Sequence, residues 1–308
     1  MERDPQKEYD IKRIQKEMNL SDKSVAACPI SQEELKKIYE DYCACLPGLE
    51  KLRTEILSTI NEGMAREVHS IRCRVKQPDH LIAKIVRGAY RNPAKYMIIN
   101  VDNYKKMVTD LIGVRIIILD RRDWKAVHDA LLRLYRDIPE RYMRRPVDMV
   151  TNYDRYYKEV MRERSGPMCG YLAERPAVYI ASEEDRKLYN VPNMRIDNSK
   201  THYRSVHYIV RYREVYFEIQ MRSLFEEGWL EFDHRMKYPN DQYNKKKQEY
   251  ISILSNLATA ADQLISYYRE EDFLDKNEEP VAEENNVSAD AQALARARNL
   301  EEKLKILF

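Results

Sequence analysis

The sequence predicts an α+β fold, in which a mixed β-sheet of about five strands is flanked by helices, with further helices at both ends. Short runs rich in β-branched residues, such as residues 113–119 (GVRIIIL), have the composition of buried strands. Between them lie segments in which apolar residues recur at helical spacing, as in residues 124–135. The 308 residues suffice for one large domain with helical flanks.

The first part of the chain, residues 1–64, is predicted to be a helical extension. Residues 31–34 (SQEE) form a capping-box pattern, in which a serine side chain accepts a hydrogen bond from a backbone amide at the start of a helix. Apolar residues then recur at helical spacing up to Pro47 and Gly48, and again over residues 49–68. Because proline and glycine interrupt helices, we expect two antiparallel helices here.

The central part, residues 65–240, contains all the predicted strands. The predicted strands are residues 69–76, 113–119, 177–181, 193–196, 205–212 and 214–221, of which the last two form a hairpin. The predicted helices are residues 79–87, 104–109, 124–135 and 225–236. Residues 140–173, rich in tyrosine and arginine, are predicted to be a lid or an insertion.

The last part, residues 241–308, is predicted to be a second helical extension. Residues 248–269 carry an apolar face at helical spacing, and we expect this helix to pack on the sheet. Residues 275–288 are acidic and contain a proline, which is typical of a linker. Residues 289–308 have the pattern of a short amphipathic helix that docks on the body or binds a partner.

The composition argues against several kinds of site. The chain has seven glycines and no GxxxxGK[ST] or GxGxxG pattern, so neither a P-loop nor a dinucleotide-binding loop is supported. A formal net charge of +2 gives no overall field that would mark a nucleic-acid-binding protein. The five cysteines are scattered, and the spacing of Cys43 and Cys45 is too short for a zinc pair, so we expect free thiols.

The sequence also bears on where the protein acts. The N-terminal residues are rich in charged side chains and do not have the composition of a signal or transit peptide. No apolar run is long enough to cross a membrane. We therefore expect a cytoplasmic protein with no membrane partner.

Two carboxylates indicate where the chemistry takes place. Asp110 opens the segment DLIGVRIIIL, which runs into the strand at residues 113–119, and Glu218 lies inside an apolar strand. A carboxylate within an apolar strand is costly to bury unless it has a firm partner or a chemical role. Carboxylates that can hold Mg²⁺, in basic surroundings, indicate a metal-dependent phosphate-transfer site. The structural alternative for both acids is an ordinary salt bridge.

Basic and aromatic residues accompany the two acids. Arg74, Lys76 and Lys84 come from a strand end and the first turns of the next helix, so they can converge on one place. The alternative is a solvated basic edge, because runs of charge usually lie on surfaces. Tyr203 begins an aromatic and basic segment and either stacks on a nucleotide base or packs in the core.

These segments together resemble the synthetase domain of the RelA/SpoT family, the (p)ppGpp alarmone synthetases. The resemblance covers roughly residues 65–240, and each motif is weak alone but the ordered set is specific. The matching segments, in the order of the family, are Arg74, Lys76 and Lys84 (R-x-K-x(7)-K), residues 110–115 (DLIGVR), residues 203–207 (YRSVH), residues 218–222 (EIQMR) and residues 229–234 (WLEFDH).

The resemblance implies a fold similar to nucleotidyltransferases and a specific activity. That activity is a Mg²⁺-dependent pyrophosphokinase reaction, in which pyrophosphate moves from ATP to the ribose 3′-hydroxyl of GDP or GTP. It implies Asp110 and Glu218 as catalytic and metal-binding residues. The implied ATP-binding residues are Arg74, Lys76, Lys84 and Arg115. The implied acceptor-nucleotide-binding residues are Lys200, Tyr203, Arg204, His207, Gln220 and Arg222.

The sequence departs from the family pattern near the nucleotide-binding loops. His80 stands where the family usually has serine, His202 where it usually has glycine, and residues 198–201 (NSKT) replace the usual approach to the YRSxH loop. These departures leave open a toxic relative that acts on adenine nucleotides or the 3′ end of tRNA, and an inactive nucleotide-binding module. A homo-oligomeric state and a neutralising antitoxin partner also stay open.

Overall fold

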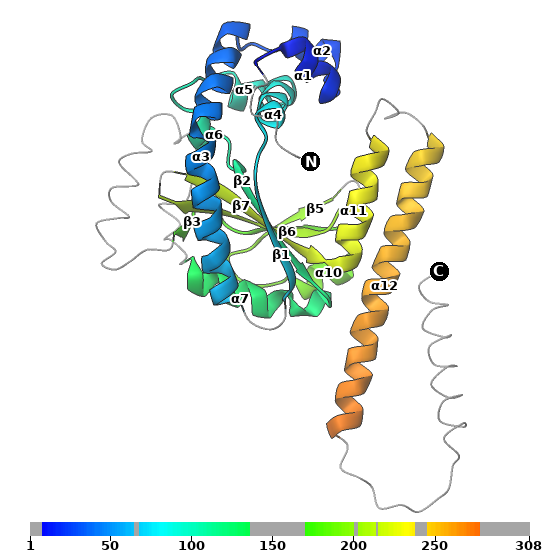
Figure 1. Cartoon of the computed structure of the whole chain (residues 1–308). Coiled ribbons are helices and arrows are strands. Elements are labelled where there is room, and N and C mark those ends of the chain that lie inside the picture. The colour runs from blue at the N-terminus through cyan, green and yellow to red at the C-terminus, as the bar shows by residue number, and fades with distance from the viewer. Residues whose placement is uncertain are drawn as a thin grey trace, which may run out of the picture.

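A mixed β-sheet of seven strands forms the centre of the molecule (Figure 1). This computed structural model describes residues 8–64, 68–135, 170–199, 203–213, 215–237 and 245–277. The strands are β1 (Val68–Val75), β2 (Ile112–Ile118), β3 (Tyr171–Leu172), β4 (Ala177–Ile180), β5 (Arg195–Asn198), β6 (Ser205–Tyr212) and β7 (Val215–Ser223). Their order is β1-β2-β7-β6-β4-β5, and β3 pairs with β6. β2 runs parallel to β7 and β4 parallel to β5, whereas the other pairs are antiparallel.

The predicted α+β class with a mixed sheet is confirmed, but the sheet has more strands than the predicted number of about five. One of the seven, β3, lies at the end of the stretch 140–173, to which the sequence analysis assigned no strand. Its two residues pair with Val210 and Arg211 of β6. A strand this short has no alternation of polar and apolar residues by which it could be recognised. The rest of the predicted insertion, up to residue 169, lies outside the described residues.

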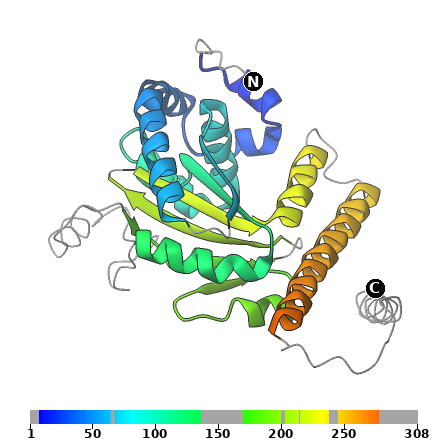
Figure 2. The same ribbon diagram turned by 60° about the horizontal axis from the view of Figure 1, so that its bottom comes forward.

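Helices flank the sheet. They are α1 (Ile11–Glu17), α2 (Asp22–Ala26), α3 (Gln32–Gly63), α4 (Pro78–Arg91), α5 (Pro93–Tyr96), α6 (Tyr104–Met107), the 3₁₀ helix η1 (Arg121–Asp123), α7 (Trp124–Leu134), α10 (Glu183–Leu188), α11 (Leu224–Lys237) and α12 (Lys245–Asn277). The long helix α3 and helix α7 lie against the sheet, and α11 and α12 run side by side at its far end (Figures 1 and 2).

The prediction of two antiparallel helices in the N-terminal part is wrong, because α3 is a single helix that continues through Pro47. Its start is as predicted: the Ser31 hydroxyl accepts a hydrogen bond from the Glu34 backbone amide. A proline removes one helical hydrogen bond, and here the buried face of the helix continues on both sides of it. The residues of that face include Tyr39, Tyr42, Leu49, Leu52 and Ile56. The packing of this face on the sheet therefore outweighs the local preference for a break.

The sheet has an apolar face that is packed in the main core. On β2, the alternate residues Ile112, Val114 and Ile116 are buried in this core. The core residues of the neighbouring strands are Phe217, Ile219 and Met221 of β7 and Val206, Tyr208 and Val210 of β6. Since successive side chains of a strand point to opposite faces, the residues between these project to the other face.

The N-terminal helices share this core with the sheet. One cluster of buried apolar residues runs from Ile14 of α1 through α3 and α4 to Met221 of β7. An ion pair of Arg13 with Asp79, with contacts of 2.6 and 2.9 Å, holds α1 against the first turn of α4. The division of the chain after residue 64 stays a prediction.

Polar contacts join α11 to α12 and join this pair of helices to the body of the molecule. The indole N–H of Trp229 on α11 donates to the Ile251 carbonyl on α12 at 3.0 Å. The Ser223 hydroxyl at the end of β7 donates to Asp262 at 2.6 Å, and the Arg269 guanidinium contacts Asp123 at 2.8 Å. The predicted helix 248–269 is thus longer, packs on α11, and reaches the sheet at the end of β7. Residues 278–308, with most of the predicted linker and the amphipathic segment, lie outside the described residues.

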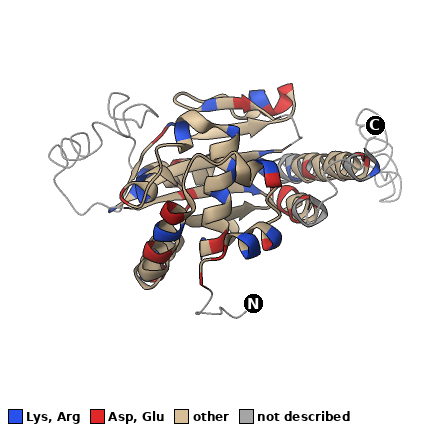
Figure 3. Cartoon of the chain, turned by 90° about the horizontal axis from the view of Figure 1, so that it is seen from above, with Lys and Arg blue, Asp and Glu red and all other residues tan. Residues whose placement is uncertain are grey.

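Charge and hydropathy of the helices bear on a membrane location. Basic and acidic residues both occur on the helices (Figure 3). Within the part of the chain that the structure describes, no helix is long and apolar enough to span a bilayer.

The continuity of α3 generates a stability prediction at Gly48. A Cβ atom added there would meet no atom within 4 Å. Alanine has a higher helix propensity than glycine, so we expect Gly48→Ala to stabilise the protein by about 1 kcal/mol. This corresponds to a rise in melting temperature of about 2–4 °C, measurable by calorimetry.

Gly88→Ala on α4 is the matched control. A Cβ atom at Gly88 would overlap the ring of Tyr96, so the same substitution should destabilise the protein despite its helical position. If Gly48→Ala lowered the melting temperature instead, residues 47 and 48 would not lie within a continuous helix.

Two buried carboxyl groups make the docking of α12 sensitive to pH. Asp262 on α12 and Glu226 on α11 are each 2% exposed, and one oxygen of each has no hydrogen-bond partner. Burial raises the pKa of Glu226 to about 7 and that of Asp262 to about 6, and Arg204 opposes both shifts. The charge of Asp262 adds to the shift of Glu226, and the charge of Asp120 adds to that of Asp262. These folded-state values exceed the ordinary ones of about 4. The two groups therefore favour folding at low pH, and that contribution is lost as the pH rises through 6 and 7.

We expect Asp262→Asn to stabilise the protein at pH 8, because it removes a buried charge while keeping an oxygen that can accept from Ser223. A gain of about 2–4 °C in melting temperature at pH 8 should shrink at pH 5, where wild-type Asp262 is already protonated. An equal shift at both pH values would contradict the assigned ionisation.

Candidate active site

The pairing register of three strands gathers the polar residues of the sheet in two rows. In the first row, Arg74 of β1 pairs with Gly113 of β2, which pairs with Glu218 of β7. In the second row, Arg72 pairs with Arg115, which pairs with Gln220. Directly paired residues project to the same face of a sheet, so cations from β1 and β2 lie beside acceptors from β7.

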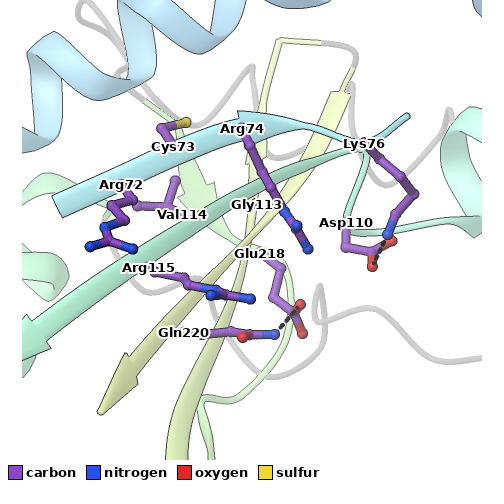
Figure 4. Close-up of a pocket in the computed structure, with 10 residues that line it drawn as sticks. All are labelled: Arg72, Cys73, Arg74, Lys76, Asp110, Gly113, Val114, Arg115, Glu218 and Gln220. Atoms are coloured by element: carbon purple, nitrogen blue, oxygen red, sulfur yellow. Dashed lines mark hydrogen bonds and ion pairs between the residues drawn. The ribbon is translucent and has the colours of Figure 1, made fainter. Parts of the chain in front are cut away.

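A cavity of about 300 Å³ lies over these rows. Its lining residues are Arg72, Cys73, Arg74, Lys76, Asp110, Gly113, Val114, Arg115, Glu218 and Gln220. Figure 4 shows the side chains of Arg74 and Arg115 directed toward Glu218, with Lys76 and Asp110 at one end of the cavity. The space above Gly113 is open, because a Cβ atom added there would meet nothing within 4 Å.

Asp110 lies between two lysine side chains. Its carboxylate contacts the Lys76 ammonium group at 3.0 Å and the Lys84 ammonium group at 2.7 Å. Burial by itself would raise the pKa of Asp110, but the two ammonium groups outweigh it and lower that pKa. Asp110 is therefore ionised at neutral pH and holds both cations at the end of the cavity.

Local structure explains how the two lysines reach one carboxylate. Lys76 follows β1, where its backbone N–H donates to the Leu111 carbonyl at 2.8 Å and its own carbonyl accepts from the Tyr42 hydroxyl at 2.7 Å. Pro78 then occupies the first turn of α4, a position where its missing N–H costs nothing. Lys84 lies on α4 and reaches Asp110 from the other side.

Glu218 is held at both of its oxygens. One oxygen contacts Nδ1 of His207 at 3.0 Å, and the other accepts from the Gln220 amide at 2.8 Å. Burial raises the pKa of Glu218, but the hydrogen bond from His207 opposes it and the net effect is a lowered pKa. Glu218 is therefore a carboxylate that can accept a proton at neutral pH.

An aromatic cluster lies next to Glu218. The Tyr203 hydroxyl contacts Nε2 of His207 at 2.7 Å, and the ring of Tyr179 lies 5.6 Å from that of Tyr203 and 4.8 Å from that of His207. The Arg222 guanidinium lies 5.7 Å from the Tyr203 ring. Tyr203 also packs against the cluster of Trp229 and Leu230, so core packing accounts for part of its contacts.

Helix α11 supplies acids that the sequence analysis did not single out. Arg115 contacts Glu227 at 2.8 Å and Glu231 at 2.7 Å, and Arg222 contacts Glu227 at 3.3 Å and hydrogen-bonds Gln220. Burial by itself would lower the pKa of Arg115, but these two glutamates outweigh it and raise that pKa. In the sequence, the signal that could have identified these two glutamates is their spacing of one helical turn. Arg72 and Tyr179 had no sequence signal beyond their place on predicted strands.

The structure brings most predicted site residues together. Arg74, Lys76, Asp110, Arg115, Glu218 and Gln220 line the cavity, Lys84 contacts Asp110, and His207, Tyr203 and Arg222 continue from Glu218. Lys200 and His202 lie outside the described residues, and His80 is exposed on the first turn of α4.

Arg204 lies apart from this cavity. Its guanidinium contacts Asp185 at 2.8 Å, Glu226 at 3.2 Å and the Thr259 hydroxyl at 2.7 Å. Burial works to lower the pKa of Arg204, but the two carboxylates outweigh it and raise that pKa. Its contacts join α10, α11 and α12, and none of them reaches the cavity.

The sequence matches the family described as "Region found in RelA / SpoT proteins" over residues 73–243, which is more than half of the chain. The protein therefore belongs to the RelA/SpoT family, a family of pyrophosphate-transferring enzymes. No relative among the curated proteins matches it in sequence.

Solved structures also resemble this one. The small alarmone synthetase 1 from Bacillus subtilis bound to its product pppGpp is 19% identical, with 73% of this chain and 92% of that chain covered and a TM-score of 0.42. A GTP pyrophosphokinase family protein from Streptococcus pneumoniae is 15% identical, with 79% and 95% covered and a TM-score of 0.42. The small alarmone synthetase 2 from Bacillus subtilis is 18% identical, with 76% and 96% covered and a TM-score of 0.37. The fold of this protein is defined by the order and the register of its own strands.

The separate positions of Arg74 and Arg204 lead to opposite expectations. Arg204→Ala leaves the buried Glu226 without its cation and leaves Asp185 with Arg121 alone, so we expect a loss of about 3–5 kcal/mol in stability, measured by chemical denaturation. Arg74→Ala removes an exposed side chain at the cavity, so stability should change by about 0.5 kcal/mol or less. Equal losses of stability in both variants would contradict this division of roles.

Proposed function

We propose that this protein transfers pyrophosphate from ATP to the ribose 3′-hydroxyl of GDP or GTP and so makes (p)ppGpp. The observation that carries the proposal is the cavity between Asp110, with its two lysines, and Glu218, in a chain of the RelA/SpoT family. The cations suit a triphosphate and the carboxylate of Glu218 suits a hydroxyl that must lose a proton.

In the proposed reaction, one bond to phosphorus forms and one breaks. The 3′-oxygen of the acceptor attacks the β-phosphorus of ATP, the bond from that phosphorus to the α–β bridging oxygen breaks, and AMP leaves. Glu218 takes the proton of the attacking hydroxyl. Its lowered pKa keeps it ready to accept that proton at neutral pH.

The ATP side of the proposed site is the end of the cavity with the basic residues. Lys76 and Lys84 bind the phosphates, and Arg74 and Arg115 flank the adenine, since guanidinium groups stack on planar rings. In this structure, the ammonium groups of both lysines contact Asp110. Phosphate oxygens compete for the same ammonium groups, so ATP binding would free Asp110 to interact with a metal ion.

Mg²⁺ fits the donors present here. Proteins commonly hold this ion with one or two carboxylates, while substrate phosphates and water complete the shell. Asp110 and Glu218 are two carboxylates on one cavity, and no larger group of metal-binding side chains occurs among the described residues. Asp110 with Glu218 would hold Mg²⁺, which supplies neutralisation of the phosphate charge.

The acceptor side is the aromatic cluster beyond Glu218. Tyr203 offers a ring face for the guanine base, while His207, Gln220 and Arg222 surround the carboxylate. Lys200 stays a prediction. We omit Arg204 from the proposed acceptor site, because its guanidinium is engaged by Asp185, Glu226 and Thr259.

The deciding assay is incubation of the purified protein with Mg²⁺ and γ-labelled ATP. GDP, GTP, adenine nucleotides and deacylated tRNA are offered as acceptors in separate reactions. Transfer of label to a guanine nucleotide supports the proposal. Transfer only to tRNA or adenine nucleotides would replace it with the toxic relative, and binding of nucleotides without transfer would indicate an inactive module.

We expect Asp110→Ala and Glu218→Ala each to lower turnover by about a hundredfold or more, because each removes a charge that acts on the reacting groups. Circular dichroism and melting temperature should show a folded protein in both cases. Lys125→Ala on α7 is the control, since that side chain is exposed and forms an ion pair with Asp129 on the same helix. Undiminished turnover in either acidic variant would refute the assignment of the site.

A further inference from the structure

Three side chains form a hydrogen-bonded chain at the acceptor end of the site. Glu218 Oε1 contacts His207 Nδ1 at 3.0 Å, and His207 Nε2 contacts the Tyr203 hydroxyl at 2.7 Å. His207 and Glu218 lie on the paired strands β6 and β7, and Tyr203 lies just before β6. One imidazole thus joins the proposed base-stacking ring to the proposed proton acceptor.

The imidazole of His207 has little freedom to move. Its side chain is 16% exposed and that of Glu218 is 19% exposed. The rings of Tyr179 and Tyr203 lie edge-on to it at 4.8 and 5.8 Å. Both nitrogens are engaged, so a rotation of the ring would break two hydrogen bonds in a poorly hydrated place.

The chemistry of the partners determines the tautomer. A carboxylate only accepts hydrogen bonds, so Nδ1 of His207 carries the hydrogen and donates to Glu218. In the neutral ring Nε2 then has a free lone pair and accepts from the Tyr203 hydroxyl. The other oxygen of Glu218 accepts from Gln220 at 2.8 Å, so the carboxylate is fixed at both ends.

We propose that His207 is a positioning residue, which holds the carboxylate of Glu218 for proton transfer and couples that carboxylate to the ring of Tyr203. An acceptor base that stacks on Tyr203 sets the position of its hydroxyl, and the imidazole transmits that position to Glu218. General-base catalysis needs the carboxylate within about 3 Å of the proton that it removes, so small displacements lower the rate strongly. This inference rests on the proposed function.

Two amide substitutions separate the two ends of the imidazole. Asparagine places its amide nitrogen near the position of Nδ1, so His207→Asn keeps a donor to Glu218 and loses the link to Tyr203. Glutamine places its amide near Nε2, so His207→Gln keeps a partner for Tyr203 and loses the donor to Glu218. Tyr203→Phe removes the link from the other side and keeps the ring face.

We expect His207→Gln to lower kcat about tenfold or more, with the KM for the acceptor nearly unchanged, because the loss concerns the placement of Glu218. His207→Asn should lower kcat less than His207→Gln does, because it keeps a donor to Glu218. Tyr203→Phe should lower kcat about threefold, and adding it to His207→Gln should cause no further loss, because both interrupt one chain. Equal losses in the two His207 variants, or additive effects in the double variant, would overturn the proposal.

A measurement without substrate separates this proposal from the proposed function. Nitrogen-15 NMR of the His207 ring should show the hydrogen on Nδ1 and none on Nε2, as the contacts with Glu218 and Tyr203 require. If wild type transferred no pyrophosphate, the proposed function would fail, whereas the spectrum would still decide the hydrogen bond. A hydrogen on Nε2 with none on Nδ1 would overturn the positioning role even in an active enzyme.

Discussion

The pairing register of β1, β2 and β7 is the constraint on which the rest of the structure depends. It aligns Arg74 with Gly113 and Glu218 on one face. Because side chains alternate along a strand, a shift of one residue would turn these polar groups into the core and the core residues out to solvent. The apolar alternation of β2, with Ile112, Val114 and Ile116 buried, makes such a shift costly. The core that stabilises the sheet therefore also specifies the geometry of the cavity.

Each of the two carboxylates at the site has partners that compensate its charge. Asp110 is compensated by Lys76 and Lys84, so two cations and one anion meet at the end of the cavity. Glu218 is compensated by hydrogen bonds from His207 and Gln220. Isolated charges at this depth would be costly, and these partners offset that cost. In the proposed function, phosphates or a metal ion would exchange with partners that are already of the right charge.

Much of the fold and of the site was predictable from local sequence. Residues 113–119 and the hairpin of β6 and β7 have strong strand patterns, and the motifs around Asp110, Tyr203 and Glu218 identified a family that the match over residues 73–243 confirms. Other features were not predictable, because they depend on distant packing. The continuation of α3 through Pro47 needs the sheet beneath it, and the engagement of Arg204 with Asp185, Glu226 and Thr259 needs α10, α11 and α12 in place.

By itself, the sequence determined the types of elements, the family and the residues that could take part in binding or catalysis. These follow from periodicity, composition and spacing along the chain. Only the tertiary structure decided which of those residues share a cavity. It placed Lys84 on Asp110 and His207 between Glu218 and Tyr203, and it placed Arg204 in a separate network. The physical reason is that side-chain direction and ion pairing depend on strand register and helix docking, and these arise from contacts between segments far apart in the sequence.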